Sequence, residues 1–407
     1  MTKEIQQETI RGIALRAKAL GGRAMLVGGC VRDALTGRGS ADIDCEVYGL
    51  APQALRSLAA EFGEVDESGA RYGIFSLKGA GIDLAVPRLE RRTGPKHGDF
   101  DVRLDPALPF ARAAARRDFT VNAILQDALT GEIVDPFGGQ DDLRRGVLRA
   151  VPGDGFAEDP LRVLRGAQFA ARFRLSPDAK TLEKMRTMRT DALSPARVLG
   201  EMKKAMASDA PDVFFDVLRR ADALRTWFGE LAALIGVPQP PRYHPEGDAY
   251  THSMRVLHAA AQKKARALRP EAFVFAALTH DLGKAVSTAR GEDGEWHACG
   301  HENTGVPLTR AMLGRLGVNR EIIAYCENMC RLHMRAHVCH YRQAETGETN
   351  LLFDESVCPN DLALLAVCDT LGKGSASGGA AGEEAFLTGS VRVYEETEAR
   401  GLPEGSK

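Results

Sequence analysis

The chain has 407 residues, of which 27% are charged and 44% hydrophobic, and its formal net charge is -2 at pH 7. This length allows two or three domains with separate cores, and the near-neutral charge excludes attraction by the whole molecule as the means of binding a polyanion. No apolar run is long enough to cross a bilayer, and the amino-terminal segment lacks the apolar core of a signal peptide. Eight cysteines in a chain of this size do not predict a disulfide framework. We therefore expect a cytoplasmic protein without a membrane partner.

The first 150 residues predict an α/β domain. Residues 1–20 form an amphipathic helical pattern, and short β-rich runs then alternate with helical stretches. The first β-rich run ends at Gly28 and Gly29, which indicate a tight turn that leads directly into a helix. Free backbone N–H groups at that helix start, together with Arg32, would bind an anion.

Two aspartates follow this turn on the next predicted strand. In "ADIDCEV", Asp42 and Asp44 point to one face, while Ile43 and Cys45 point into the core. Two carboxylates on one strand suit Mg²⁺, because they supply hard oxygen ligands and leave coordination positions open for substrate phosphates. A solvated acidic hairpin is the alternative for this pattern taken alone. Combined with the glycine turn, it predicts a phosphate and metal site.

Residues 87–117 are basic and rich in glycine and proline, so we expect a mobile loop, either solvated or in contact with RNA phosphates. From 158 to about 234 the strand signals stop and helical patterns follow one another. This change predicts a separate helical domain.

Asp159, Arg162 and Arg165 lie at i, i+3 and i+6, in a helix whose first turn is favoured by Pro160. An aspartate can accept a hydrogen bond from the exocyclic amine that cytosine and adenine share, and an arginine can donate to the adjacent ring acceptors. Such a pair could select C and A without a nucleic-acid template. An ion pair on a solvated helix is the alternative.

Residues 236–250 are rich in proline and predict a linker, and residues 372–384 predict a flexible loop. Between them lies a second helical region with the segment "CENMCRLHMRAHVCH", residues 326–340. Its Cys and His spacing allows a structural zinc site, but Cys326 and Cys330 share one helical face with apolar residues. We interpret these cysteines as small core side chains.

His280 and Asp281 interrupt an apolar helix, with His252 before them and Asp369 after them. The order His, His-Asp, Asp resembles that of HD phosphohydrolases. His301 and His333 are candidates for a two-metal centre. We interpret three other histidines of this region as satisfied core residues: His258, His337 and His340.

The motifs "GGCVRD", "DID", "RRDFTVNAI", "DPFGG" and "EDPLRVLR" resemble, over nearly the whole chain, those of the bacterial tRNA nucleotidyltransferase and poly(A) polymerase family, specifically CCA-adding enzymes with an HD domain. The resemblance implies an α/β polymerase-β-like palm with an antiparallel or mixed sheet, followed by all-α domains. The expected division is a nucleotidyltransferase palm over 1–152, a helical nucleotide- and RNA-binding domain over 153–235, and an HD phosphohydrolase-like domain over 236–407.

The resemblance also implies template-independent addition of C and A to the 3′ end of tRNA from CTP and ATP, together with a metal-dependent HD phosphoesterase. The implied palm residues are Asp42 and Asp44 for catalysis and Mg²⁺, and Gly29, Arg32, Arg117, Asp159, Arg162 and Arg165 for nucleotide binding. The implied HD ligands of a transition metal, Ni²⁺ or Mn²⁺, are His252, His280, Asp281 and Asp369, with His301 and His333 as further candidates. The chain departs from the family at Gln168 and Lys373, where arginines are expected.

Several alternatives stay open at this point. The enzyme could add only CC or only A, and a poly(A) polymerase shares the first motifs, although "GARYGIF" replaces the basic segment expected there. A phosphohydrolase with a silent palm, or a non-catalytic RNA-binding module, would be expected to lose Asp42 and Asp44. The sequence leaves the oligomeric state open.

Overall fold

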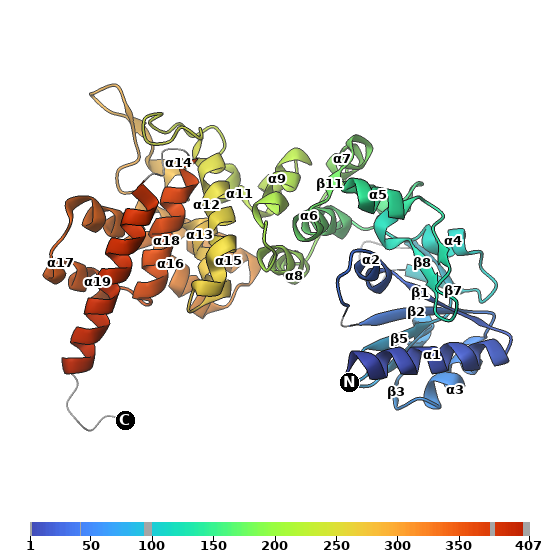
Figure 1. Cartoon of the computed structure of the whole chain (residues 1–407). Coiled ribbons are helices and arrows are strands. Elements are labelled where there is room, and N and C mark those ends of the chain that lie inside the picture. The colour runs from blue at the N-terminus through green and yellow to red at the C-terminus, as the bar shows by residue number, and fades with distance from the viewer. Residues whose placement is uncertain (1, 41, 93–99, 375–378, 402–407) are drawn as a thin grey trace. The chain divides into compact units, whose positions relative to one another are not determined.

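The computed structural model describes residues 2–40, 42–92, 100–374 and 379–401. The chain divides into two compact units, Met1–Arg162 with Leu175–Thr187, and Val163–Arg174 with Met188–Lys407 (Figure 1). The predicted division into three domains stays a prediction.

A seven-stranded mixed sheet forms the centre of the first unit, in the order β3-β4-β5-β2-β1-β8-β9. The central strand β1 (Arg23–Val27) pairs antiparallel with β2 (Ile43–Tyr48) and with β8 (Leu125–Asp127), while β2 pairs in parallel with β5 (Ile82–Ala85). The remaining strands of the sheet are β3 (Val65–Asp66), β4 (Ile74–Leu77) and β9 (Ile133–Val134). This arrangement confirms the expected palm with a mixed sheet.

The two faces of the sheet bury different side chains. Helices α1 (Lys3–Ala19) and α3 (Pro52–Ala60) pack on one face, where Cys45 and Val47 of β2 join their apolar residues in one core. Alternation along the strand then turns Asp44 and Glu46 toward the opposite face. A second cluster lies there, formed by Met25, Val27, Tyr48, Leu108, Ala113, Ala114, Ala123, Leu125 and Val151.

The prediction of a mobile loop over residues 87–117 is wrong for most of that stretch. Strands β6 (Arg88–Arg92) and β7 (Phe100–Leu104) form an antiparallel hairpin, and helix α4 (Phe110–Ala114) follows. Both glycines of this stretch and one of its four prolines lie at 94–98, between the two strands. Residues 93–99 lie outside the described part of the chain.

Short elements complete the first unit. They are α2 (Gly29–Leu35), η1 (Ala70–Tyr72), η2 (Thr120–Asn122), α5 (Gly139–Arg145), β10 (Val147–Leu148), η3 (Gly155–Glu158), β11 (Ser176–Pro177) and α7 (Ala179–Arg186). Strands β10 and β11 pair in parallel as a separate two-stranded sheet.

The second unit is helical. Helix α6 (Leu161–Phe173) contributes all but its first two residues, and α8 (Pro195–Met206), α9 (Asp212–Arg220), α10 (Leu224–Trp227) and α11 (Gly229–Ala232) follow. Its larger part consists of α12 (Ala249–Lys263), η4 (Lys264–Arg266), α13 (Pro270–Thr279), α14 (Lys284–Ser287), α15 (His301–Leu316), α16 (Arg320–Arg342), α17 (Thr346–Asp354), α18 (Pro359–Gly372), α19 (Ala380–Gly401) and a hairpin of β12 (Ala289–Arg290) with β13 (Trp296–His297). Helix α13, buried along almost its whole length, packs against α12, α16 and α18.

Three expectations for this unit have clear outcomes. Helix α16 confirms the helical interpretation of the Cys- and His-rich segment, since Cys326 and Cys330 are buried on it beside Met329. Helix α19 begins at Ala380, inside the predicted flexible loop, of which residues 375–378 lie outside the described part. The stretch 233–248 contains no helix or strand, as expected, but it packs against the unit and is more than a linker.

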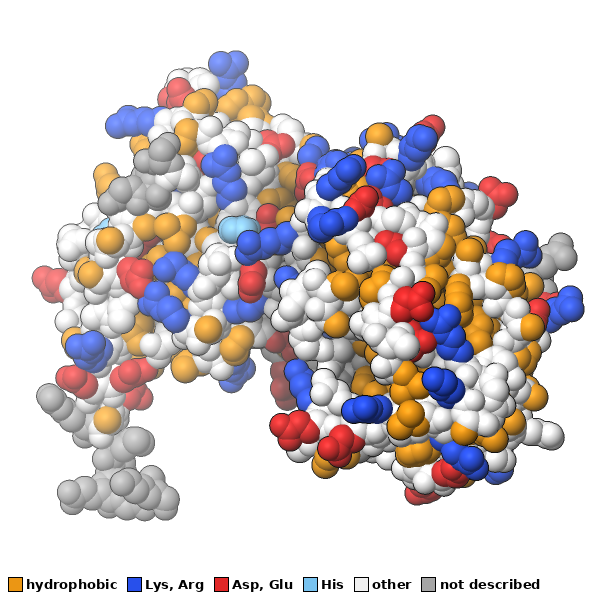
Figure 2. All heavy atoms as spheres, turned by 45° about the vertical axis from the view of Figure 1, so that its right-hand side comes forward, with side chains coloured by type: hydrophobic (Ala, Val, Ile, Leu, Met, Phe, Trp, Pro, Cys, Tyr) orange, Lys and Arg blue, Asp and Glu red, His pale blue; other side chains and the backbone are white. Residues whose placement is uncertain are grey.

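None of the helices among the described residues combines the length and the apolar composition needed to cross a membrane. On the face of the molecule drawn in Figure 2, Lys and Arg side chains lie in small groups beside Asp and Glu. This distribution agrees with local rather than global attraction of a polyanion.

Candidate active site and metal centre

The glycine turn after β1 is required by both backbone conformation and space. Gly28 has φ +74° and ψ -130°, a region that L side chains rarely adopt. A Cβ atom at this position would lie 2.7 Å from Nη1 of Arg117 and 3.6 Å from Oδ2 of Asp44. The turn therefore lets Arg117 approach the predicted metal ligand Asp44. Gly29, by contrast, has room for a Cβ, whose nearest neighbour would be Nη2 of Arg32 at 3.6 Å.

A buried carboxylate on β2 holds two arginines. Glu46 is 2% exposed and accepts hydrogen bonds from Nη2 of Arg116 at 2.7 Å, from Nη2 of Arg117 at 3.2 Å and from the hydroxyl of Tyr48 at 2.9 Å. Burial raises the pKa of Glu46, but the two guanidinium groups and Tyr48 outweigh it, so the pKa is lowered. Glu46 thus stays ionised and fixes Arg117 beside Asp44, a role that the sequence analysis missed.

Asp44 lies among other carboxylates. Its side chain reaches solvent, yet neighbouring protein atoms partly desolvate it, and this desolvation, together with the charges of Asp83, Asp42 and Glu46, raises its pKa despite Arg117. Asp83 of β5 stands opposite Asp44 in the sheet register, and sequence analysis did not single it out. Among the described residues, no set of three ligand atoms within 4.8 Å of one another includes Asp42 or Asp44. A divalent cation would relieve the repulsion at this strand, so the residues fit one.

Arg32 is buried, at 5% exposure, in the structure. Its Nε and Nη2 donate to Oδ1 of Asp33 at 2.9 and 2.7 Å, and Nη1 donates to Oδ1 of Asn122 at 2.6 Å. Asp33 and Asn122 thus hold this guanidinium, and its nucleotide-binding role stays a prediction.

A cavity of about 450 Å³ in the first unit brings Asp159 and Arg162 together with Arg112, Arg116 and Tyr72. Asp159 precedes α6 rather than lying within it, and its Oδ1 accepts from the backbone N–H of Leu161 at 3.0 Å.

Arg162 lies in the first turn of α6 and donates to the carbonyl oxygens of Gly155 at 2.8 Å and Arg116 at 2.7 Å. The predicted base-reading pair therefore lines one cavity. Arg165 belongs to the second unit, where its guanidinium lies 5.0 Å from the ring centroid of Phe169, and Gln168 is buried there at 1% exposure.

In the second unit the residues of the HD pattern converge from separate helices. His252 of α12, His280 at the end of α13 and Asp369 of α18 offer ligand atoms within 4.8 Å of one another, and all three are buried. Nε2 of His252 lies 2.8 Å from Oδ1 of Asp369. A second buried group with the same spacing consists of Asp281, His301 and His333.

Asp281 connects the two groups. Its Oδ2 lies 3.2 Å from Nε2 of His280 and 3.5 Å from Nε2 of His252, and its Oδ1 lies 3.1 Å from Nε2 of His301 and 3.6 Å from Nε2 of His333. The Lys284 ammonium lies 2.6 Å from Oδ2 of Asp281, whereas Oδ1 of Asp281 and Nε2 of His280 are buried without a hydrogen bond. Buried polar atoms are normally satisfied, so these two atoms fit a cation as partner.

The protonation states of Asp281 and His333 suit metal ligands. Burial raises the pKa of Asp281, but the charges of His280 and Lys284 outweigh it and hold the pKa well below its ordinary value. Burial lowers the pKa of His333 to about 4, so its imidazole is neutral at neutral pH. An ionised carboxylate and a neutral imidazole are the forms that bind metals.

An outer layer of polar side chains supports these ligands. His337 of α16 lies 2.6 Å, through Nε2, from Oδ2 of Asp369 and 2.6 Å, through Nδ1, from Oε1 of Glu383, so it is a satisfied histidine as predicted, but one that contacts a candidate ligand. His258 is not a core residue, since its side chain is 48% exposed and pairs with Asp212. Sequence analysis missed Glu383 and also Glu246, whose side chain is fully buried beside His252. In the sequence, Glu246 was recognisable only as a carboxylate near His252 in the chain, and Glu383 only as a carboxylate on a later helix.

A cavity of about 480 Å³ in the second unit opens next to this centre. It is lined by His301 and Asp369 of the centre, by Lys284 and Lys373, and by aromatic side chains that include Trp296. The Lys284 ammonium pairs with Asp281 at 2.6 Å, and the Lys373 ammonium beside the candidate metal ligands would attract a phosphate ester.

Comparison with known proteins agrees with both sites. Residues 24–149 match the poly A polymerase head domain, and residues 249–371 match the HD domain. A multifunctional CCA protein from Nitrosococcus oceani is 41% identical over 77% of this chain and 74% of its own, and one from Stenotrophomonas maltophilia is 38% identical over 84% of each. The solved structure of a Thermotoga maritima CCA-adding enzyme complexed with tRNA is similar in fold, with a TM-score of 0.61 and 17% identity over 98% of this chain and 87% of that one.

The two sequence relatives are more than a third identical to this chain over segments that include both the head and the HD regions, and the fold comparison also covers both regions. The chain therefore belongs to the family of multifunctional CCA proteins.

Proposed function

We propose that this chain adds C and A nucleotides to the 3′ end of tRNA without a nucleic-acid template. A ribose hydroxyl of tRNA attacks the α-phosphate of CTP or ATP, and pyrophosphate leaves. The observation that carries this proposal is Asp44 on β2, placed beside Arg117 by the Gly28 turn, in a chain whose curated relatives are multifunctional CCA proteins. The tRNA complex of a protein with the same fold supports tRNA as the partner.

The head and HD domains both imply dependence on divalent metals. At the palm we assign Mg²⁺ to Asp42 and Asp44, where it would lower the pKa of the attacking hydroxyl and neutralise charge on the leaving group. Glu46 holds Arg117 so that the guanidinium faces the same region, where it can bind a substrate phosphate oxygen. Gly29 and Arg32 complete the proposed phosphate site.

Base selection is assigned to the cavity that contains Asp159 and Arg162. Asp159 accepts a hydrogen bond from the exocyclic amine of cytosine or adenine, and Arg162 donates to the neighbouring ring acceptors. Uracil and guanine present a carbonyl oxygen where the amine is needed, so they leave the carboxylate without a donor. Arg165 is a further proposed nucleotide ligand.

We assign the HD centre to a metal-dependent phosphoesterase that acts on RNA 3′ ends such as 2′,3′-cyclic phosphates. His252, His280, Asp281 and Asp369 would hold a transition metal, Ni²⁺ or Mn²⁺, and His301 and His333 would hold a second ion with Asp281 between the two. Lys373 in the adjacent cavity would bind the phosphate. Attack of water on the cyclic phosphate with cleavage of the P–O3′ bond would leave the phosphate on O2′ and supply the free 3′ hydroxyl that nucleotide addition needs.

The test uses tRNA that ends before the CCA sequence, after CC, or after CCA, each incubated with the purified protein and both CTP and ATP, of which one is labelled at a time. The expected result is addition of two C and one A to the first substrate, of A to the second, and none to the third. Addition of A without limit would identify a poly(A) polymerase, and addition of only CC or only A would identify a partial enzyme. Absence of incorporation with all three would contradict the proposal.

A further inference from the structure

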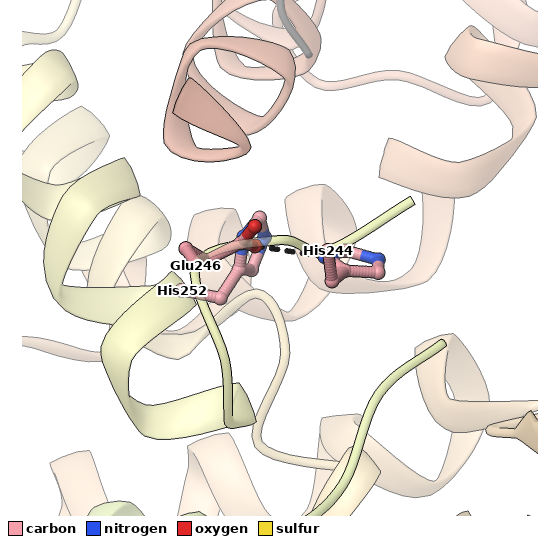
Figure 3. A group of neighbouring side chains, drawn as sticks. All are labelled: His244, Glu246 and His252. Carbon is pink, nitrogen blue, oxygen red and sulfur yellow. Dashed lines mark hydrogen bonds and ion pairs between the residues drawn. The ribbon is translucent and has the colours of Figure 1, made fainter. Parts of the chain in front are cut away.

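A buried carboxylate lies in the proline-rich stretch that sequence analysis interpreted as a linker. Oε1 of Glu246 is 2.7 Å from Nδ1 of His252 and 2.9 Å from Nδ1 of His244, and the Glu246 side chain is 0% exposed. Figure 3 shows the carboxylate beside the two imidazole rings. Oε1 of Glu246 therefore holds the Nδ1 edge of both imidazole rings.

The bond to Glu246 determines which atom of His252 is available to a metal. A carboxylate only accepts hydrogen bonds, so Nδ1 of His252 carries a proton, and Nε2, which faces the Asp369 carboxylate, is the nitrogen that gives up its proton when a metal ion binds between them. This Nε2 is the atom that lies 2.8 Å from Oδ1 of Asp369 and 3.5 Å from Oδ2 of Asp281. The ring is thus oriented with its basic nitrogen toward the candidate metal ligands.

We propose that Glu246 is a positioning residue of the HD centre, which holds His252 in the tautomer and orientation that bind the metal. This inference rests on the proposed metal centre. Carboxylates that hydrogen-bond the second nitrogen of a metal-binding histidine raise the affinity of that histidine for the metal. Glu246 acts through His252 and does not itself contact the ion.

The local structure holds Glu246 at this position. Two residues later, Asp248 caps α12 by accepting from the backbone N–H of Thr251 at 2.9 Å, and its other oxygen accepts from the backbone N–H of Gly236 at 2.6 Å. The second bond connects Gly236, at the start of the proline-rich stretch, to Asp248 near its end. His244 binds the same Glu246 oxygen, which restricts rotation of the carboxylate.

A cation bound directly by His244, Glu246 and His252 is the alternative, since their ligand atoms lie within 4.8 Å of one another. The two short hydrogen bonds disfavour it, because both Nδ1 atoms already donate to the carboxylate. A cation bound by these three residues would require Nδ1 of His252 to lose its proton, while Nε2 of the same ring faces Asp369 and Asp281. The experiment below separates the two interpretations by the number of ions bound.

The test is a calorimetric titration of metal-free full-length protein with Ni²⁺ alone, and in parallel with Mn²⁺ alone. Glu246→Gln keeps the size of the side chain but can present its amide nitrogen to His252, and the expected result is a metal affinity about 10- to 100-fold lower than wild type. Glu246→Asp keeps the charge on a shorter side chain, and an intermediate affinity is expected. The matched control is Asp212→Asn, which removes a carboxylate from Nδ1 of His258 on the same helix and should leave the affinity unchanged.

His244→Ala is expected to keep the number of bound ions, whereas loss of one ion would show that the three residues form a cation site and would overturn the inference. Equal metal affinities for wild type and Glu246→Gln would overturn it as well, with the proposed metal centre left intact. A wild-type protein that binds neither ion would overturn the metal centre itself. Thermal melting of the metal-free variants, with nucleotide addition as a second check, shows whether each is folded. If Glu246→Gln is not folded, a folded Glu246→Asp variant with a lowered affinity and a displaced His252 ring in its NMR spectrum supports the inference, and a displaced ring with unchanged affinity contradicts it.

Discussion

The palm carboxylates and the HD centre present metal ligands in opposite ways. Asp42 and Asp44 are exposed, whereas His252, His280 and His333 have no exposed surface. In the palm, repulsion among carboxylates is relieved only when a cation and the substrate phosphates arrive. In the HD centre, hydrogen-bonded partners orient the ligands before any metal binds. We infer that the first site assembles with its substrate and that the second is preorganised.

The largest expected effect separates the two chemistries. Asp42→Ala or Asp44→Ala should lower nucleotide incorporation at least about 1000-fold, because the metal contributes several kcal/mol of transition-state stabilisation. Hydrolysis of a 2′,3′-cyclic phosphate by the same variants should equal that of wild type. Labelled CTP incorporation and cyclic-phosphate hydrolysis, measured on one preparation, check both.

The fold of these variants should be intact. The pKa of Asp44 is raised in the folded protein, so its ionised form opposes folding at neutral pH, and this effect disappears as the pH falls below the pKa of the unfolded chain. Asp44→Ala should therefore melt at or above the wild-type temperature at pH 7, with a smaller difference at acidic pH. Glu64→Gln, which removes one charge from the surface of the same unit, is the control for incorporation. Near wild-type incorporation by Asp44→Ala would contradict the palm assignment.

The converse change should remove the second activity. The double variant His280→Ala/Asp281→Ala eliminates two candidate ligands, and we expect at least about a 100-fold loss of phosphoester hydrolysis in the presence of Ni²⁺, Mn²⁺ or Mg²⁺. Nucleotide addition should be unchanged. His258→Ala, at a half-exposed histidine of the same unit, controls for loss of an imidazole. Hydrolysis that persists in the double variant would show that another site catalyses it.

The same comparison explains how far the sequence predicted the structure. Palm elements were predictable because their signals are local: alternation in "ADIDCEV" places Ile43 and Cys45 in the core, and the glycine pair ends a strand. Glu46 and Asp83 were missed because their roles depend on pairing between strands and on contacts with Arg116 and Arg117, which lie far away in the chain. No local pattern encodes such contacts.

In the HD region, the ligand types and their order were recognisable, but the partners were not. Glu246 lies among prolines and glycines that indicate irregular backbone, and this signal says nothing about burial. Glu383 is separated from His337 by 46 residues, and residues 372–384 read as a flexible loop although α19 begins within them. The composition of these two stretches indicated irregular backbone, but it did not indicate that Glu246 and Glu383 are buried against histidines.

A smaller effect is expected for base selection, which tests whether the palm reads its substrate through Asp159. Asp159→Ala should weaken discrimination against UTP and GTP by about 1–3 kcal/mol, or roughly 5- to 150-fold, since one base contact is lost. Alanine also removes the acceptor for the N–H of Leu161. Asp159→Asn is the matched variant, because its amide oxygen can keep that local bond while its amide nitrogen changes the edge presented to the base. Unchanged selectivity in both variants would contradict the proposed role.

The smallest change tests whether the open palm site depends on a particular turn. Gly28→Ala places a side chain at φ +74°, which we expect to cost on the order of 1 kcal/mol of folding free energy. The added Cβ would meet the guanidinium tip of Arg117, a flexible group that can move, so the effect on nucleotide addition should be a modest loss through displacement of Arg117 from Asp44. Gly29→Ala is the control for stability, because its Cβ makes only an ordinary contact and its backbone is helical. Denaturant unfolding of the two variants checks the first effect, and equal stabilities for both would show that the backbone of the turn relaxes without strain.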